Sequence, residues 1–133
     1  MTGLPVNHYV KNMCITYVYF LMEKSGNKFK IGLTQCPIRR FEYLKKHHSF
    51  NIQSTILISF TEYDNAFKFE KLLHKRFKVF RTKVSGKFSG YTEFFYYHCF
   101  HEVFTFVIDK GLKDSIKILS LKNNRYLIEK LFS

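Results

Sequence analysis

The chain has 133 residues, 46% of them hydrophobic, which is enough for one domain with a real core and too little for two ordinary domains. Its 22 basic and 10 acidic side chains give a formal net charge of +12, and this excess favours a polyanionic partner. Three widely spaced cysteines argue against a disulfide scaffold, and the apolar stretch at 12–22 is too short to span a membrane.

The first predicted elements are two strands that form an antiparallel hairpin. Residues 14–22 are β-branched and aromatic, residues 25–27 (Ser-Gly-Asn) are typical of a turn, and residues 28–34 resume the alternation. Gly32 lies near the end of the second strand and permits close approach of the backbone to another group.

Two helices and a third strand follow. Pro37 suits the first turn of a short helix that ends near His47 and His48. The stretch from Gln53 to Phe60 is apolar at its centre and predicts a buried strand. A second helix is expected from Asn65 to about Val79, with one apolar stripe made of Ala66, Phe69, Leu72, Leu73 and Phe77.

The rest of the chain predicts a basic loop at 81–92, a short strand or its equivalent at 92–95, and a buried helix at 98–110. The apolar spacing after Gly111 predicts one or two further amphipathic helices. The expected fold is α/β of the α+β type, a small three-stranded antiparallel sheet flanked by helices. We expect an N-terminal segment at 1–13, a domain at 14–97 and a C-terminal helical extension at 98–133 packed on it.

Arg40 and Glu70 are candidates for phosphodiester chemistry, which needs a deprotonated water and positive charge on the phosphate oxygens. We choose Arg40 over Arg39 because the apolar positions of the first helix fix its buried side, and a guanidinium fork matches phosphate. Glu70 lies on the flank of the second helix, and His74 follows four residues later on the same side. Glu70 is a candidate ligand for Mg²⁺, which often binds only one or two protein carboxylates. A surface arginine and an ordinary surface pair of Glu70 with His74 or a lysine are the alternatives that spacing alone leaves open.

Five short motifs stand in a specific order along the chain. They are Tyr17-Val18-Tyr19, Lys30-Ile31-Gly32, Arg40, the helix with Ala66, Glu70, His74 and Phe77, and Thr92-Glu93-Phe94-Phe95. Together they resemble a GIY-YIG nuclease domain over about residues 15–97. The similarity is closer to the divergent branch found in phages, large DNA viruses and fungi, which is often described only as DNA-binding.

The resemblance implies a role for five residues. Tyr19 would position or deprotonate the attacking water, Arg40 would stabilise the pentacoordinate phosphate, and Glu70 would bind a single Mg²⁺ or Mn²⁺ ion. His74 would assist proton transfer or hold a phosphate. At Gly32, a side chain would crowd the substrate.

Three positions depart from the better-studied members of that family. Lys30 stands where they have the second tyrosine, Tyr17 where they have the first glycine, and Glu93 near their late asparagine. Lys30 is therefore a catalytic candidate beside Tyr19, either as the base or as a charged clamp on phosphate. Arg39 and Glu93 are secondary candidates for the site.

The resemblance and the charge together predict a Mg²⁺-dependent endonuclease, a hydrolase that cuts DNA phosphodiester bonds by a single-metal mechanism. The alternative is a catalytically inactive DNA-binding or regulatory module on the same fold, and RNA is a second possible substrate. A basic run without an intervening acid would follow the DNA backbone; it consists of Lys71, Lys75, Arg76, Lys78, Arg81, Lys83 and Lys87.

The expected location is intracellular and soluble, in the cytoplasm, or in the cytoplasm or nucleus of the host if the protein is viral. No leader sequence is recognised and no membrane contact is expected, so the protein should not be secreted. A protein partner or a homodimer contact would use residues 98–133.

Overall fold

Six antiparallel strands form one sheet in the part of the chain that this computed structural model describes, residues 15–114 and 117–120. The strand order is β4-β5-β2-β1-β3-β6. The strands are β1 (Thr16–Glu23), β2 (Lys28–Thr34), β3 (Phe50–Phe60), β4 (Arg81–Thr82), β5 (Phe94–Tyr96) and β6 (Lys117–Ser120). The helices are α2 (Pro37–Lys45), α3 (Tyr63–Arg76) and α4 (Phe100–Asp114), with 3-10 turns η1 (Lys78–Phe80) and η2 (Tyr97–Cys99).

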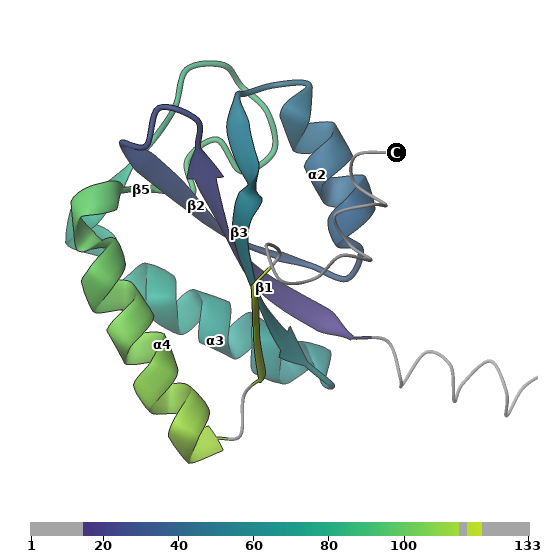
Figure 1. The fold of residues 1–133 in the computed structure, drawn as a ribbon, viewed down its shortest axis with the longest axis vertical. Helices are drawn as coiled ribbons and strands as arrows, with labels where there is room; N and C mark the ends of the chain where they lie inside the picture. Colours follow the sequence, from purple (N-terminus) through teal and green to yellow (C-terminus); the bar gives the residue numbers. More distant parts are fainter. Residues whose placement is uncertain (1–14, 115–116, 121–133) are drawn as a thin grey trace, which may run out of the picture.

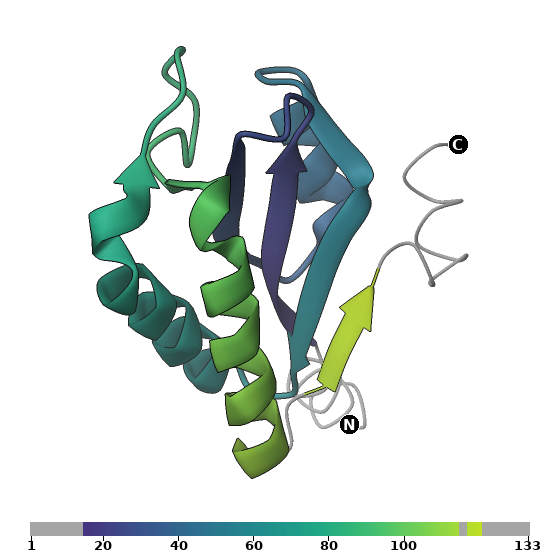
Figure 2. The ribbon, with the colours of Figure 1, turned by 60° about the vertical axis from the view of Figure 1, so that its left-hand side comes forward.

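Helices cover both faces of this sheet. Figure 1 shows α2 on one side of the central strands and α3 and α4 on the other, and the turned view in Figure 2 shows the same two layers. The long connection between β4 and β5 rises at the end of the sheet, beside the turn of the β1–β2 hairpin. The order of helix and strand along the chain therefore gives an α+β fold.

The prediction of a three-stranded sheet is wrong. β2, β1 and β3 form its centre, but β5 and β4 extend it beyond β2, and β6 pairs with the outer edge of β3. The short strand expected at 92–95 is present as β5, although its pairing with β2 was not predicted, and β4, with two residues, is too short for an alternating pattern to be visible in sequence. β6 lies where the apolar spacing predicts a helix, and pairing with the exposed edge of β3 overrides that local preference.

Two predicted segments, the N-terminal segment at 1–13 and the apolar stretch at 127–131, lie outside the described residues. The helix expected at 98–110 is present as η2 and α4, and Val103 and Val107 of α4 belong to the same core as the sheet. No helix among the described residues is long and apolar enough to cross a membrane.

Alternate residues of β1 enter two separate cores. Val18 and Phe20 belong to the core under α3 and α4, whereas Tyr19 and Leu21 belong to the core under α2, as the two-residue period of a strand requires. Tyr19 and Glu70 therefore belong to opposite faces of the sheet, because Glu70 lies on α3. The two side chains can meet only where the sheet has an edge.

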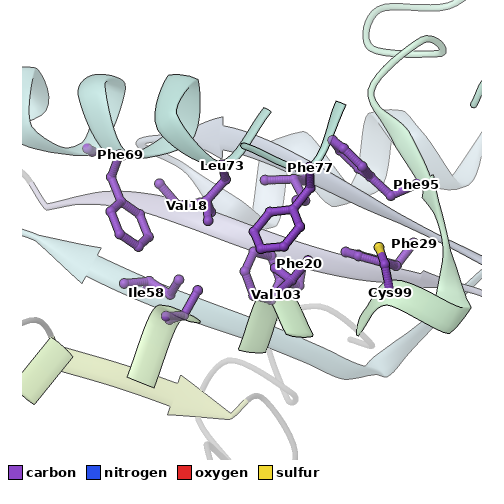
Figure 3. Close-up of a cluster of buried hydrophobic side chains, with 13 residues drawn as sticks. Val18, Phe20, Phe29, Ile58, Phe69, Leu73, Phe77, Phe95, Cys99 and Val103 are labelled. Atoms are coloured by element: carbon purple, nitrogen blue, oxygen red, sulfur yellow. The ribbon is translucent and has the colours of Figure 1, made fainter. Parts of the chain in front are cut away.

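Figure 3 shows the core on the α3 and α4 side. Phe69, Leu73 and Phe77 of α3 point toward β1, and Val103 approaches from α4. These buried positions fix the rotation of α3 about its axis, and they leave Glu70 and His74 on its flank toward β2.

The sheet has a free edge at the end of β2, where side chains from its two faces can meet. β5 pairs only with Lys28–Lys30, and the last hydrogen bond of this ladder is donated by the Ile31 amide to the Glu93 carbonyl at 3.2 Å. Among the described residues no strand pairs with positions 32–34 on that side. Side chains from both faces of the sheet converge at this edge.

Candidate functional site

A cavity of about 400 Å³ lies at the free edge of β2. α2 contributes Arg40 from one face, α3 contributes Glu70 from the other, and β1 contributes Tyr19 between them. The complete lining is Tyr19, Leu33, Arg40, Phe67, Glu70, Lys71, Ser89 and Glu93. Three residues that sequence analysis placed in one site, Tyr19, Arg40 and Glu70, thus border one space.

Tyr19 is fully buried and is one of the residues that line this cavity. The hydroxyl oxygen accepts a hydrogen bond from Lys30 Nζ at 3.0 Å and one from Arg40 Nε at 3.3 Å. The ring packs edge-on against Phe41, with centroids 5.2 Å apart. The phenol oxygen is therefore held between two cations.

Gly32 lies directly opposite Tyr19 in the β1–β2 ladder. A Cβ at position 32 would overlap the end of the Tyr19 ring. The glycine is thus required for the tyrosine itself to reach the cavity, whereas the resemblance implied that a side chain there would crowd the substrate.

Arg40 is connected to both walls of the cavity. Its Nε donates to the Tyr19 hydroxyl, and its Nη2 donates to the Ser89 carbonyl at 3.0 Å in the loop between β4 and β5. The guanidinium carbon also lies 5.3 Å from the centroid of the Tyr43 ring. Arg39 is exposed and lies outside the cavity lining, so of the two neighbouring arginines the structure brings only Arg40 to the site.

Lys30 is fully buried and forms an ion pair with Glu93, with Nζ 2.6 Å from Oε1. A buried ammonium needs such a partner, because desolvation without one is costly. Burial opposes ionisation of Glu93, but the charge and hydrogen bond of Lys30 outweigh it, and the pKa of this carboxyl is lowered. Lys30 lies behind Tyr19 and Glu93 and does not itself line the cavity.

Gly90 closes the loop over this ion pair. Its φ of +87° is in the left-handed region, and a Cβ there would lie 2.6 Å from Lys30 Nζ. Only glycine combines a left-handed backbone with the lack of a Cβ, so Gly90 allows the loop to pack directly against Lys30.

Glu70 is almost fully buried on the flank of α3, and burial raises the pKa of its carboxyl. The negative charge of Glu93 raises it further, while Lys71, Lys30 and Arg81 act in the opposite direction. A divalent cation between Glu70 and Glu93 would relieve both the burial cost and the repulsion.

These oxygen donors suit Mg²⁺ or Mn²⁺, which often keep several waters and bind one or two protein carboxylates. The described residues hold no group of three or more His, Cys, Asp or Glu side chains placed to bind a metal. Glu70 and Glu93 are the carboxylates of the cavity that could hold such an ion.

Both ring nitrogens of His74 are engaged, and its Nε2 also lies 3.4 Å from Glu70 Oε2, the i, i+4 pair that spacing alone left open as an alternative. Its Nε2 donates to the Ile31 carbonyl at 2.9 Å, and its Nδ1 accepts from Arg81 Nη2 at 2.7 Å. Burial lowers the pKa of the ring, which matches the neutral form that this pattern requires. His74 thus connects α3 to the free edge of β2. Its part in proton transfer stays a prediction.

The sequence matches the T5orf172 domain over residues 16–112, from the start of β1 into α4. The chain belongs to the T5orf172 domain family. This phage-associated family is related to nuclease-type folds, which agrees with the coarse part of the resemblance drawn from the motifs. No curated protein and no solved structure matches the chain.

The T5orf172 match includes every residue that lines the cavity and every residue of the predicted basic run. All seven basic side chains are exposed, but three of them make specific contacts. Lys71 lines the cavity, Arg81 donates to His74, and Arg76 lies 4.5 Å from the centroid of the Phe106 ring on α4.

Sequence analysis missed Phe67, Ser89 and Gly90 of this T5orf172 domain. Phe67 carries a usable signal, since it falls outside the apolar stripe of its helix and lies three residues before Glu70. Ser89 and Gly90 belong to a loop whose path follows from contacts with Arg40 and Lys30 across more than 45 residues of sequence. Tyr17, the remaining motif position, is partly buried and packs against the α2-side core, where burial raises the pKa of its hydroxyl.

Proposed function

We propose that this T5orf172 domain is a metal-dependent endonuclease of the GIY-YIG type that hydrolyses DNA phosphodiester bonds. The observation that supports it is the convergence of Tyr19, Arg40 and Glu70 on one cavity, although they come from different faces of the sheet. An acceptor for a water proton, a guanidinium for phosphate and a carboxylate for a cation are the groups that this reaction needs.

In this proposal Arg40 binds the scissile phosphate. A guanidinium has five N–H donors, and the contacts with Tyr19 and Ser89 use Nε and Nη2, which leaves Nη1 for phosphate oxygens. These two contacts also fix the plane of the group before substrate arrives, so its charge is preorganised for the transition state.

Tyr19 takes the part of the base. Tyr19 lines the cavity, and a phenolate oxygen would keep the hydrogen bonds from Lys30 and Arg40. The proton of the attacking water would move to this oxygen. Lys30, which is paired with Glu93 and does not line the cavity, positions Tyr19 rather than touching the water.

Glu70, with Glu93 beside it, would hold one Mg²⁺ or Mn²⁺ ion, which supplies positive charge to the departing oxygen when bound. The exposed basic residues from Lys71 to Lys87 would contact the DNA backbone on either side of the cut. Residues 98–133 remain the proposed place for a protein partner or a second copy.

Nicking of supercoiled plasmid in Mg²⁺, Mn²⁺ and EDTA tests the proposal. Glu70→Gln and Arg40→Ala should lower the rate about 10²- to 10³-fold, the usual loss for one transition-state contact, while DNA binding is retained. Arg39→Ala is the matched control, and it should cost far less because that side chain lies outside the cavity lining.

The second candidate is a DNA-binding module that does not cut. The contacts of Tyr19 favour it, because two cations already occupy the oxygen that must accept the proton. Absence of nicking in every metal, together with salt-sensitive binding, would establish this candidate and reject the nuclease.

A further inference from the structure

An exposed pair of aromatic rings lies on α3, and one of the two lines the cavity. Tyr63 and Phe67 are 48% and 41% exposed at i and i+4 of α3. Their rings stack, with centroids 6.1 Å apart and planes 22° from parallel. The core under this helix is built by other residues, so the pair adds little to folding.

Phe67 joins this pair to the proposed site. It lines the cavity together with Glu70, one turn further along α3, and with Arg40 from the opposite face. Lys71 lines the same cavity, and its Nζ lies 5.3 Å from the centroid of the Phe67 ring. A flat apolar wall and a cation thus stand beside the groups proposed to act on phosphate.

We propose that Phe67 stacks against an unpaired DNA base next to the scissile phosphate, while Lys71 contacts the neighbouring backbone. This rests on the proposed nuclease function and adds its substrate class, which is DNA unpaired at the cut, as in a flap or a frayed end. A base inside a duplex is stacked on both faces, whereas an unpaired base offers a free π-face to an aromatic side chain. Tyr63 stacks on the Phe67 ring and extends the platform, and Lys71 leaves its place over that ring for the backbone when a base binds.

The absence of tryptophan from the sequence gives a clean readout. The fluorescent base 2-aminopurine is placed at one position in two DNA oligonucleotides, unpaired in a flap and paired in a full duplex. Binding is measured in EDTA, so that no strand is cut. Wild-type protein should bind the flap more tightly than the duplex and should quench the flap emission.

Phe67→Leu keeps the apolar bulk and removes the flat ring. It should weaken flap binding by about tenfold or more, in line with the usual loss of one base–aromatic stack, and it should abolish quenching while duplex binding stays nearly unchanged. Phe67→Tyr should behave as wild type. Tyr96→Leu removes an aromatic side chain that is 44% exposed but lies outside the cavity lining, and it should leave flap binding unchanged.

Equal flap binding and equal quenching by wild type and Phe67→Leu would overturn this inference, as would equal affinity of the wild type for flap and duplex. A failure of the nuclease proposal would be seen in the cleavage assay and not in the binding assay. Cleavage of the flap in Mg²⁺ or Mn²⁺ that is unchanged in Phe67→Leu would keep the nuclease and remove the platform. Quenching that depends on Phe67, without cleavage of flap or plasmid in any metal, would instead remove the nuclease and with it the scissile phosphate.

Discussion

At the scale of single residues, Tyr19 can take its position only because the residue opposite it in the β1–β2 ladder is a glycine, which has no side chain. Gly32 is its cross-strand partner, and the space that a Cβ would occupy is filled by the phenol ring. The same ring packs on Phe41 and its hydroxyl accepts from Lys30 and Arg40. A change at position 32 therefore acts on the site through Tyr19.

Gly32→Ala should lower stability by about 1 to 3 kcal/mol, the usual cost of overpacking, and should lower any nicking activity as well. The Tyr19 ring must move, which breaks its hydrogen bonds with Lys30 and Arg40. Thermal unfolding followed by circular dichroism measures the first effect. Gly26→Asn is the control, because no atom lies within 4 Å of a Cβ there and asparagine tolerates its φ of +82°; a similar loss in both variants would contradict the explanation.

Glu70 should couple metal binding to stability. Because its pKa is raised in the folded state, folding favours the protonated form, and stability is lost as pH rises from the ordinary value of 4.5 through the folded pKa. At neutral pH, Glu70→Gln should therefore be more stable than the wild type without metal.

Addition of Mg²⁺ should reverse that order. A concentration of 100 times Kd stabilises a single site by about 2.7 kcal/mol, so the melting temperature of the wild type should rise while that of Glu70→Gln stays constant. Differential scanning fluorimetry with a Mg²⁺ series measures the shift. Equal shifts in both proteins would exclude Glu70 as the ligand.

At the scale of elements, His74 connects α3 to the free edge of β2 and to β4. Its ring satisfies the Ile31 carbonyl at the point where β5 no longer pairs, and it accepts from Arg81. A second proton on Nδ1 would point at the guanidinium, so acid should break this connection. Desolvation by burial is the main cause of the lowered pKa, Arg81 and Lys30 contribute in the same direction, and the Ile31 hydrogen bond and Glu93 oppose it.

The wild type should therefore lose stability as pH falls from 6.5 through the lower pKa of folded His74, because the unfolded chain binds more protons in that window. His74→Gln cannot titrate, so its stability should vary less with pH in that window, although it should be less stable at pH 7 by about 1 to 3 kcal/mol where the hydrogen bonds are lost. Urea unfolding between pH 5 and 7.5 measures both effects. His101→Gln changes an exposed histidine and should keep the wild-type profile; a wild-type profile for His74→Gln would disprove the assignment.

The elements that sequence predicted correctly are those that local pattern determines. The β1–β2 hairpin, α2, β3 and α3 have runs of seven or more residues with clear periodicity. The short strand at 92–95 was also predicted, but β4 and β6 were not, and these short strands, like the pairing of β5, depend on edges built by distant residues. The residues of the candidate site differ in the same respect. Arg40 and Glu70 were predicted from the faces of their helices. The pairing of Lys30 with Glu93 was not, because it joins positions 63 residues apart that no local pattern connects.

At the scale of the whole molecule, the net charge of +12 should give the proposed DNA binding a strong salt dependence. The exposed residues of the β4–β5 connection, Lys83 and Lys87, lie in the same loop as Ser89, which lines the cavity. A duplex or flap placed with its phosphate at Arg40 would pass this loop. Its lysines should therefore contact phosphates, each releasing about one counterion.

Lys83→Ala and Lys87→Ala should each make the slope of log K against log salt concentration less steep by about 0.9, and by similar amounts on every DNA sequence, since phosphate contacts carry no base information. Lys110→Ala removes the same charge from the last turns of α4, which runs away from this loop (Figure 2) and lies outside the cavity lining, and it should leave the slope unchanged. Fluorescence anisotropy of labelled DNA over a range of salt concentrations measures the slopes. If all three variants lost the same amount, the loop would not be the contact surface, and binding would reflect only the total charge of the protein.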